Sequence, residues 1–418
     1  MKNEQNAPKI RFKGFTDAWE QRKFSDFTFP AGERNKDDLD LEPFAITSNQ
    51  GFIAQSEAHD DFGYMKDVDR KMYIVVKPNS FAYNPARINV GSLGYYEGAE
   101  NVIVSSLYEV FQTAEYVDDK FLKHWFKTKA FQDWIERLQE GSVRLYFYYD
   151  KLCECIMSMP SVEEQRKIGA YLDKIDNLIT LHQRKCETLQ KLKKSMLQKM
   201  FPKNGSCFPE IRFAGFTDAW EQRELGECME TVTDYVAAGS FADIAENVQY
   251  KTFPDFAQLI RTVDLKHEFK NNDYIYVDKK AFDYLWKVNL NVECIILPNI
   301  GANIGEVYYI EPSSLPYENN VLGPNAIFLK AKDSTKFMYT LLQADDFQNK
   351  LYVSIASSGQ PKFNKTELKA IKILIPNSAE QEKIGAYFRT LDHLITLHQR
   401  KLETLKKLKK AMLQKMFI

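Results

Sequence analysis

Two polar loops hold the residue types in this sequence that are best suited to recognition chemistry. Residues 81–89 read FAYNPARIN and residues 298–305 read PNIGANIG, and each loop interrupts strand-like runs. Amide and guanidinium groups can form paired hydrogen bonds with the edges of nucleic-acid bases. Taken singly, each such residue is more often a turn or capping residue, so base reading by any one of them is a hypothesis. The candidates are Asn84, Arg87, Asn89, Asn299 and Asn303.

A short turn rich in Gly and Ser follows later in each half of the chain, GSVRLYF at 141–147 and SGQPKF at 358–363. Arg144 and Lys362, which come after the glycines, are candidates for contact with a phosphate backbone, and Gln360 is a further candidate for nucleic-acid contact. Together with the loop residues, they make up the candidate binding site.

No pattern for catalysis accompanies these residues. The sequence has no GxGxxG loop, Walker-type phosphate loop, HExxH zinc motif or GxSxG nucleophile turn. Asn84-Pro85 is followed by Ala86-Arg87, and not by the proline–aromatic pair that amino-methyltransferases need at a flipped base. Of the six cysteines, Cys153 and Cys155 lack a second Cys or His pair that would complete a zinc site. We therefore expect free thiols, no metal and no catalytic residue.

The composition is that of an ordinary globular protein, with 44% hydrophobic and 27% charged residues. No apolar run approaches the roughly 18 residues that a membrane helix needs, and the start lacks the apolar core of a signal peptide. We therefore expect a cytoplasmic protein. The formal net charge of −1 gives no reason by itself to expect a nucleic-acid partner.

Two segments of the chain occur twice. Residues 8–22 (PKIRFKGFTDAWEQR) and 209–223 (PEIRFAGFTDAWEQR) are identical at 13 of 15 positions. Residues 164–201 and 380–417 are identical at 29 of 38 positions. Near-duplicate sequences predict near-duplicate structures, so we expect an internal repeat with a pseudo-twofold axis.

Both 38-residue segments have the apolar periodicity of long helices, and no proline interrupts them. At ~1.5 Å per residue, each would span roughly 57 Å. The simplest closed arrangement pairs the two helices antiparallel, and His182 and His398, near the two midpoints, would then lie close together. We favour ordinary interfacial histidines without a role as a switch. The predicted helix interface consists of Ile168, Ile175, Leu178, His182, Leu189, Leu192, Ile384, Leu391, Leu394, His398, Leu405 and Leu408.

Positive charge gathers in the second half of each predicted helix. Residues 183–200 carry a formal charge of +5 and residues 399–416 a charge of +6, so the rest of the chain has −12. A lysine-rich helical face is often merely solvated. The alternatives are an acidic partner surface or a phosphate backbone that passes alongside.

The segments between the repeats read as two mixed domains of strands and helices that show little mutual similarity. The predicted fold is α+β, with two mixed domains joined by two long antiparallel helices. The expected divisions are residues 1–160, a first helix over 161–202, residues 203–376, and a second helix over 377–418. In each domain a last strand is expected to end at the proline before the long helix, Pro160 or Pro376.

With this repeat, the sequence resembles the specificity subunits of type I DNA restriction–modification systems. The resemblance covers essentially the whole chain. It rests on the repeated FTDAWEQR motif (Phe15–Arg22 and Phe216–Arg223), on the two long helices, and on two dissimilar domains between similar helices. The repeated motif with its following helix is highly specific, whereas the NPARI and GANIG loops resemble those of target recognition domains only weakly.

The resemblance implies a non-catalytic protein in which each variable domain reads one half of a split double-stranded DNA target. It also implies that the helices set the spacing and dock two modification (methyltransferase) subunits, which bring S-adenosylmethionine. A restriction (translocase–nuclease) subunit can join and brings chemistry driven by ATP and Mg²⁺. No cofactor is expected in this chain.

Two rigid readers contact one face of DNA when their half-sites lie about one helical turn, ~34 Å, apart. Inserting four residues near Thr188 should therefore lengthen the unread gap without altering either half-site. A scaffold whose domains bind proteins and whose helices oligomerise remains an alternative, as does a silent gene copy that donates recognition domains. A fused restriction–methylation enzyme is the least favoured alternative, because the sequence lacks the methyltransferase motif.

Overall fold

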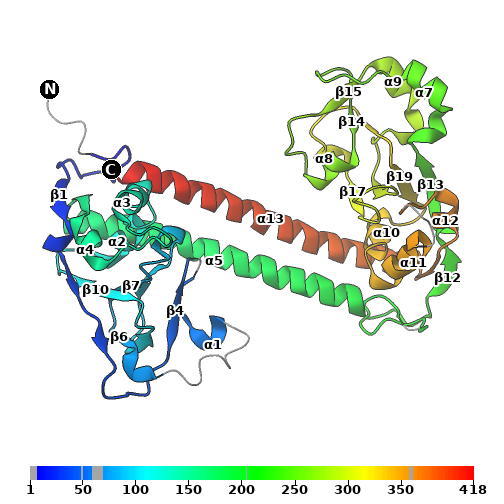
Figure 1. Ribbon diagram of the computed structural model, residues 1–418. Helices are drawn as coiled ribbons and strands as arrows, with labels where there is room; N and C mark the ends of the chain where they lie inside the picture. Colours follow the sequence, from blue (N-terminus) through cyan, green and yellow to red (C-terminus); the bar gives the residue numbers. More distant parts are fainter. Residues whose placement is uncertain (1–6, 49, 59–68, 204, 357–360) are drawn as a thin grey trace. The chain divides into compact units, whose positions relative to one another are not determined.

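The computed structural model describes residues 7–48, 50–58, 69–203, 205–356 and 361–418 (Figure 1). The chain divides into two compact units, unit 1 made of Met1–Arg184 and Gln399–Ile418, and unit 2 made of Lys185–His398. Each unit combines a mixed body of strands and short helices with parts of two long helices, α5 (Val162–Lys199) and α13 (Ser378–Met416). The mixed fold class and the internal repeat that the sequence predicts are confirmed.

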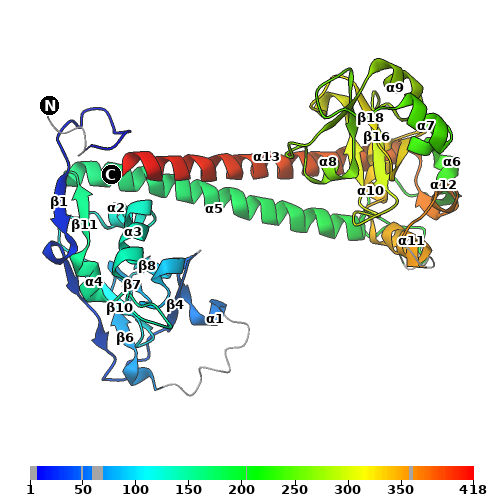
Figure 2. The same ribbon diagram turned by 45° about the horizontal axis from the view of Figure 1, so that its top comes forward.

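Unit 1 is built on a four-stranded antiparallel sheet in the order β2–β10–β7–β8. A three-stranded sheet, β3–β6–β9, and the hairpin β4–β5 complete its variable part. Outside them, β1 pairs with β11 directly before α5 begins (Figure 2). The strands are β1 (Glu20–Lys23), β2 (Thr28–Pro30), β3 (Glu33–Arg34), β4 (Phe44–Thr47), β5 (Gly51–Ala54), β6 (Ile74–Val76), β7 (Ser80–Tyr83), β8 (Leu93–Tyr96), β9 (Val102–Val104), β10 (Glu109–Thr113) and β11 (Ile156–Met159).

The late helical stretch of unit 1, expected around 121–138, forms two helices, α2 (Asp119–Trp125) and α3 (Lys129–Leu138). The break lies at Thr128, whose side-chain oxygen accepts a hydrogen bond from the Phe131 N–H (3.4 Å) and caps α3. Its hydroxyl donates to the Trp125 carbonyl (2.7 Å). The shorter helices are α1 (Gln55–Ala58), α4 (Tyr149–Glu154) and the 3₁₀ turns η2 (Phe24–Asp26), η4 (Arg70–Met72) and η5 (Ile88–Val90).

Unit 2 repeats the parts of unit 1 that adjoin the long helices. Its four-stranded sheet, β13–β19–β16–β17, has the connectivity of β2–β10–β7–β8, and β12 pairs with β20 before α13 as β1 does with β11. The variable part differs, because β14 pairs parallel with β18 in a second sheet, β15–β14–β18. The strands are β12 (Glu221–Glu224), β13 (Met229–Asp234), β14 (Ala257–Ile260), β15 (Ile275–Val277), β16 (Cys294–Pro298), β17 (Tyr308–Ile310), β18 (Asn320–Leu322), β19 (Ala326–Ala331) and β20 (Lys372–Ile375).

The helices of unit 2 follow the same order around the repeated parts. α10 (Thr335–Leu341), α11 (Asp345–Ala356) and α12 (Lys365–Lys369) occupy the chain positions of α2, α3 and α4. In both units the last strand, β11 or β20, ends just before the proline that precedes the long helix, as predicted. The other helices are α6 (Leu225–Cys228), α7 (Phe241–Asn247), α8 (Thr262–Lys266), α9 (Lys279–Tyr284) and the 3₁₀ turns η6 (Tyr235–Ala238), η7 (Trp286–Val288) and η8 (Pro312–Ser314).

Each four-stranded sheet packs against the late helices and the long-helix pair to form a core. In unit 1 this core is strongly aromatic, with Phe24, Phe81, Phe111 and Trp125 at most 1% exposed. In unit 2 the corresponding cluster is mainly aliphatic, with Ile295 and Leu329 fully buried. Buried aromatic and aliphatic area is the main stabilising contribution to each unit.

The two long helices run antiparallel within each unit. In unit 1, Ile168, Leu172 and Ile175 of α5 share a hydrophobic cluster with the end of α13, and Asp176 pairs with Lys409 at 2.5 Å. In unit 2 the end of α5 packs against the start of α13, and Lys193 pairs with Asp392 at 2.6 Å. The start of one helix therefore lies beside the end of the other.

The predicted interface residues differ in exposure. Ile168, Ile175, Ile384 and Leu391 are buried, whereas Leu178 and Leu192 are more than a third exposed. The buried side of α5 instead continues through Leu172 and Cys186, which lie four residues after interface positions, because alternate steps of four and three residues follow one face of a helix. The residues Leu189, Leu394, Leu405, Leu408, His182 and His398 are half-buried.

The proximity of His182 and His398 stays a prediction, since one belongs to unit 1 and the other to unit 2. Within the described residues, no helix is both long enough and apolar enough to cross a membrane.

Candidate nucleic-acid interface

In unit 1 the structure brings the two predicted recognition segments together. The polar loop follows β7, and residues 140–146 form a hairpin in which Glu140 and Tyr146 exchange two backbone hydrogen bonds of 2.8 Å. The backbone N–H of Phe147, a fully buried residue, donates to the Pro85 carbonyl at 3.0 Å. One backbone hydrogen bond thus fixes the hairpin to the polar loop.

The predicted residues of unit 1 divide into structural and exposed ones. The Asn84 side-chain oxygen accepts a hydrogen bond from the Ala86 N–H at 2.9 Å, which makes Asn84 a turn residue. The side chains of Arg87, Asn89 and Arg144 are exposed. These three remain the candidates for contact with a nucleic acid.

The hairpin tip has an apolar residue that the sequence motifs did not single out. Val143 is 96% exposed, and the rings of Tyr146 and Tyr148, three and five residues later, stack with centroids 5.5 Å apart. Gly141 adopts φ +133°, and a Cβ there would lie 2.0 Å from the Arg144 carbonyl oxygen. Only glycine therefore fits at this turn.

Unit 2 repeats the connection between the two segments. The Phe363 N–H donates to the Asn299 carbonyl at 3.3 Å, and the Asn299 side-chain amide donates to the Phe363 carbonyl at 3.0 Å. Phe363 is buried, as Phe147 is in unit 1. Asn299 therefore holds the two segments together, whereas Lys362 is exposed, and Gln360 lies outside the described residues.

Asn303 lies in a small polar group at the same loop. Its side-chain oxygen accepts a hydrogen bond from the Lys266 ammonium at 2.8 Å, and Lys266 also pairs with Glu306 at 2.7 Å. Lys266 comes from α8, about 40 residues earlier in the chain, so no local sequence signal connects it with this loop. It is a further cation on the candidate interface.

In both units the repeated 15-residue segment, residues 8–22 or 209–223, holds the two long helices together, and we call it the clasp. Arg11 donates two hydrogen bonds to the buried carboxylate of Glu164 in α5, at 2.8 and 2.6 Å. Arg212 does the same to Glu380 in α13, at 2.7 and 2.8 Å. This contact explains in physical terms why the segment occurs twice.

The clasp also holds the end of the opposite helix. The Ile10 N–H donates to the Lys415 carbonyl at the end of α13, and the Ile211 N–H donates to the Lys199 carbonyl at the end of α5, both at 2.9 Å. These carbonyls lack partners inside their own helices. The segment therefore satisfies one helix end while its arginine engages the start of the other helix.

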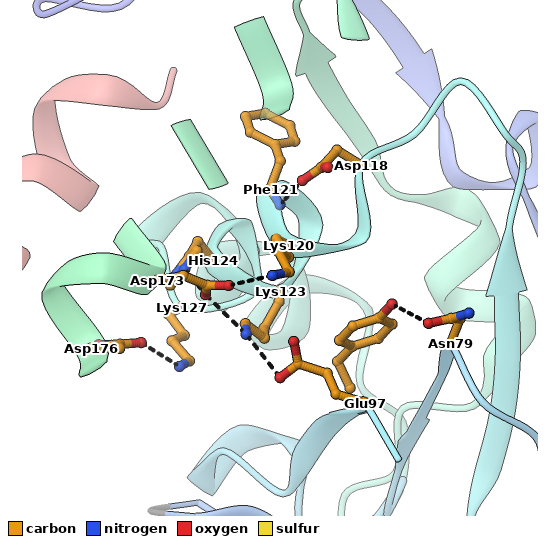
Figure 3. A network of polar contacts seen from close by, with 11 residues as sticks. Asn79, Glu97, Asp118, Lys120, Phe121, Lys123, His124, Lys127, Asp173 and Asp176 are labelled. Carbon is orange, nitrogen blue, oxygen red and sulfur yellow. Dashed lines mark hydrogen bonds and ion pairs between the residues drawn. The ribbon is translucent and has the colours of Figure 1, made fainter. Parts of the chain in front are cut away.

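A charged network joins α2 to α5 in unit 1 (Figure 3). The Asp173 carboxylate accepts hydrogen bonds from His124 Nε2 and Lys123 Nζ, both at 2.9 Å. Burial raises the pKa of Asp173, but the hydrogen bonds from His124 and Lys123 outweigh it, so its pKa lies well below the ordinary value. Burial lowers the pKa of His124, which favours a neutral ring that donates from Nε2.

The sequence did not identify this network, because His124 and Asp173 are 49 residues apart and belong to different predicted elements. Among the described residues, no group of three or more His, Cys, Asp or Glu side chains is arranged to hold a metal ion.

Comparison with known proteins gives consistent matches over most of the chain. The family model described as "Type I restriction modification DNA specificity domain" matches residues 56–191 and 218–407. The type I restriction enzyme MjaVIII specificity subunit of Methanocaldococcus jannaschii is 24% identical over 348 residues, covering 81% of this chain and 78% of that protein. A putative MjaX specificity subunit of the same organism is 23% identical and covers 98% and 95%.

The fold also has a counterpart among solved structures. The S subunit of a type I restriction–modification system from M. genitalium superposes with a TM-score of 0.62 over 99% of both chains, at 16% sequence identity. At this identity the likeness establishes the fold alone.

Proposed function

Because this chain belongs to the type I restriction-modification DNA specificity family, we propose that each of its two units reads one half of a bipartite double-stranded DNA target. The observation that carries the proposal is the shared construction of the two candidate interfaces. In both units a polar loop and a later turn meet through a backbone hydrogen bond beside a buried phenylalanine, Phe147 or Phe363. A rigid loop pair can present side chains in fixed positions, which base reading requires.

Each exposed residue has a distinct role in this proposal. Arg87 and Asn89 have the side chains for base edges, since arginine pairs well with guanine and asparagine with adenine in the major groove. Arg144, Lys362 and Lys266 are cations for the phosphate backbone, which fix position without reading sequence. The chain itself catalyses nothing and only selects the site.

The test is to map DNA methylation in the host by single-molecule sequencing, with the gene intact, deleted or replaced by variants. We expect a split motif with a fixed gap that is methylated only when the gene is present. Replacing Arg87 by Ala should relax the sequence requirement in one half-site, because a lost bidentate contact removes about 1–3 kcal/mol of discrimination, roughly 5- to 150-fold.

The matched control is Lys185→Ala, which removes an exposed cation from α5 and should leave the motif unchanged. Relaxation of both half-sites by Arg87→Ala would contradict the assignment of one unit to one half-site. If no methylated motif depends on the gene while the cognate methyltransferase is expressed, the DNA-reading function itself is wrong and a protein-binding scaffold becomes the better explanation.

The long helices are the proposed docking site for two modification subunits. Leu181 of α5 and Leu397 of α13 are equivalent positions of the repeat, and they are 46% and 38% exposed. Large apolar side chains that stay exposed at equivalent positions suit two copies of one partner. In this proposal the modification subunits bind S-adenosylmethionine, and restriction subunits, where they join, bring ATP and Mg²⁺.

Substituting these leucines should remove the partners one at a time. We expect Leu181→Asp and Leu397→Asp each to lower the copurified modification subunits from two to one per chain, and the double variant to bind none. The measurement is the mass of the purified complex by light scattering. Thr180→Asp, at an exposed neighbouring position, is the control. Two bound copies in the double variant would refute this docking site.

A further inference from the structure

The junction between each mixed body and its long helix has one carboxylate in the same place in both units. In unit 1, Tyr95 of β8 lies opposite Phe81 of β7, and Glu97 follows two residues later. In unit 2, Tyr309 of β17 lies opposite Ile295 of β16, and Glu311 follows two residues later. Phe81 and Ile295 in turn pair with the central strands β10 and β19. Glu97 and Glu311 are therefore structurally equivalent.

In unit 1 the cation that serves this carboxylate belongs to the mixed body (Figure 3). Lys123 of α2 lies between Glu97, at 3.5 Å, and Asp173 of α5, at 2.9 Å. Besides Lys123 and His124, Asp173 has a third basic partner, Lys120, whose ammonium lies 3.5 Å from the carboxylate. The long helix thus contributes a negative charge to the junction.

In unit 2 the cation belongs to the long helix. Arg389, which occupies the repeat position of Asp173, lies 3.8 Å from Glu311 and 4.2 Å above the ring of Tyr309. The position of Lys123 is taken by Tyr339, whose ring packs against Tyr309 with centroids 5.4 Å apart. Both junctions neutralise the equivalent glutamate, but with the positive charge on opposite sides.

The long helices differ at the residue that lies nearest these glutamates, Asp173 or Arg389, whereas the ion pairs between the helices are the same in both units. Of the nine differences between the 38-residue repeats, four are consecutive, at 172–175 opposite 388–391. The helix-to-helix ion pairs, Asp176–Lys409 and Lys193–Asp392, join the same residue types at equivalent positions.

We propose that Asp173 and Arg389 are address residues, by which each long helix accepts its own mixed body and rejects the other one. Two nearly identical helices would otherwise offer each body two docking sites, within one chain or between copies. If the body of unit 1 were placed against an arginine, Lys120, Lys123 and the arginine would form a cluster of positive charge in which Glu97 is the one remaining acidic partner. The body of unit 2 placed against an aspartate would lose the arginine beside Glu311 and gain a second carboxylate, with Lys336, at the position of Lys120, left as a cation that already pairs with Glu293. Like charges in a partly buried junction disfavour both wrong combinations.

The first test converts one junction into the other type in the full-length chain. Asp173→Arg and Arg389→Asp should each lower the midpoint of thermal unfolding by at least about 3 °C. Adding Lys123→Tyr to the first and Tyr339→Lys to the second should restore at least half of each loss, because the charge is then balanced again. Lys174→Thr, an exposed repeat difference beside Asp173, is the control and should change nothing.

The second test exchanges the bodies, residues 24–159 and 225–375, within one full-length chain. The double reversal, Asp173→Arg with Arg389→Asp, should destabilise the chain with its bodies in the native positions and stabilise the chain with its bodies exchanged. The readouts are the midpoint of thermal unfolding and the fraction of monomer. Additive losses in the double variants, or the same effect of reversal in both orders, would overturn the proposal. If neither exchanged chain folds, the double variants alone decide. Because unfolding is measured without DNA, the result is independent of the proposed function.

Discussion

Replacing Arg212 by Ala is expected to lower the free energy of unfolding of unit 2 by about 3 kcal/mol. The Glu380 carboxylate is fully buried and receives two hydrogen bonds from Arg212, so the substitution leaves a buried charge without its partner. Breaking such a pair typically costs about 3–5 kcal/mol. We expect the lower end, because Glu380 lies in the first turn of α13, where the helix dipole favours a negative charge. Thermal unfolding should show a drop of roughly 6–12 °C.

Two controls separate the buried charge from general damage to the clasp. Arg223→Ala removes the exposed partner of Glu221 in the same repeated segment and should cost less than about 1 kcal/mol. The double variant Arg212→Met with Glu380→Leu should recover much of the loss, since an apolar pair needs no compensation. Equal losses for Arg212→Ala and Arg223→Ala would show that the clasp does not depend on this ion pair.

Inserting four residues into both long helices, after Thr188 in α5 and after Thr404 in α13, is expected to lengthen the unread gap of the DNA target by about one or two base pairs. Four helical residues add roughly 6 Å, and one base pair rises ~3.4 Å along the DNA axis. The insertion must be made in both helices because they pair antiparallel within each unit. The half-site sequences should not change, because no loop of the candidate interface is altered.

The readout is the methylated motif, determined by sequencing in a deletion host that expresses the variant. The matched control inserts the same four residues after Gly205, in the exposed connection behind α5, and should leave the gap unchanged. A changed half-site with an unchanged gap, or an equal effect of the control insertion, would disprove the role of the helices as a spacer.

The sequence alone was sufficient for the features that depend on local pattern and on repetition. Helical periodicity without proline predicted the two long helices. The structure places them at Val162–Lys199 and Ser378–Met416. Comparing the chain with itself predicted that both halves would contain the same parts. These predictions succeed because a helix is stabilised by contacts between residues three or four apart, and because nearly identical segments fold alike.

Side-chain roles were much harder to predict. Asn84 and Asn299 were candidates for base reading, but the hydrogen bonds of their amides give them structural tasks in the loops. Leu178 and Leu192 fit an apolar stripe in the sequence, yet they are exposed because the buried side continues through Leu172 and Cys186. A stripe of this width has two possible centres, and only the position of the neighbouring helix decides between them.

The tertiary structure alone decided which distant residues meet. Arg11 reaches Glu164 across 153 residues, Phe147 fixes the hairpin to the loop of Pro85, and the charge of the junction lies on Lys123 in one unit and on Arg389 in the other. Periodicity carries no information on such pairs, because they depend on the path of the whole chain. The sequence determined the elements and their duplication, whereas the clasp, the paired loops and the two oppositely charged junctions arise only when those elements pack.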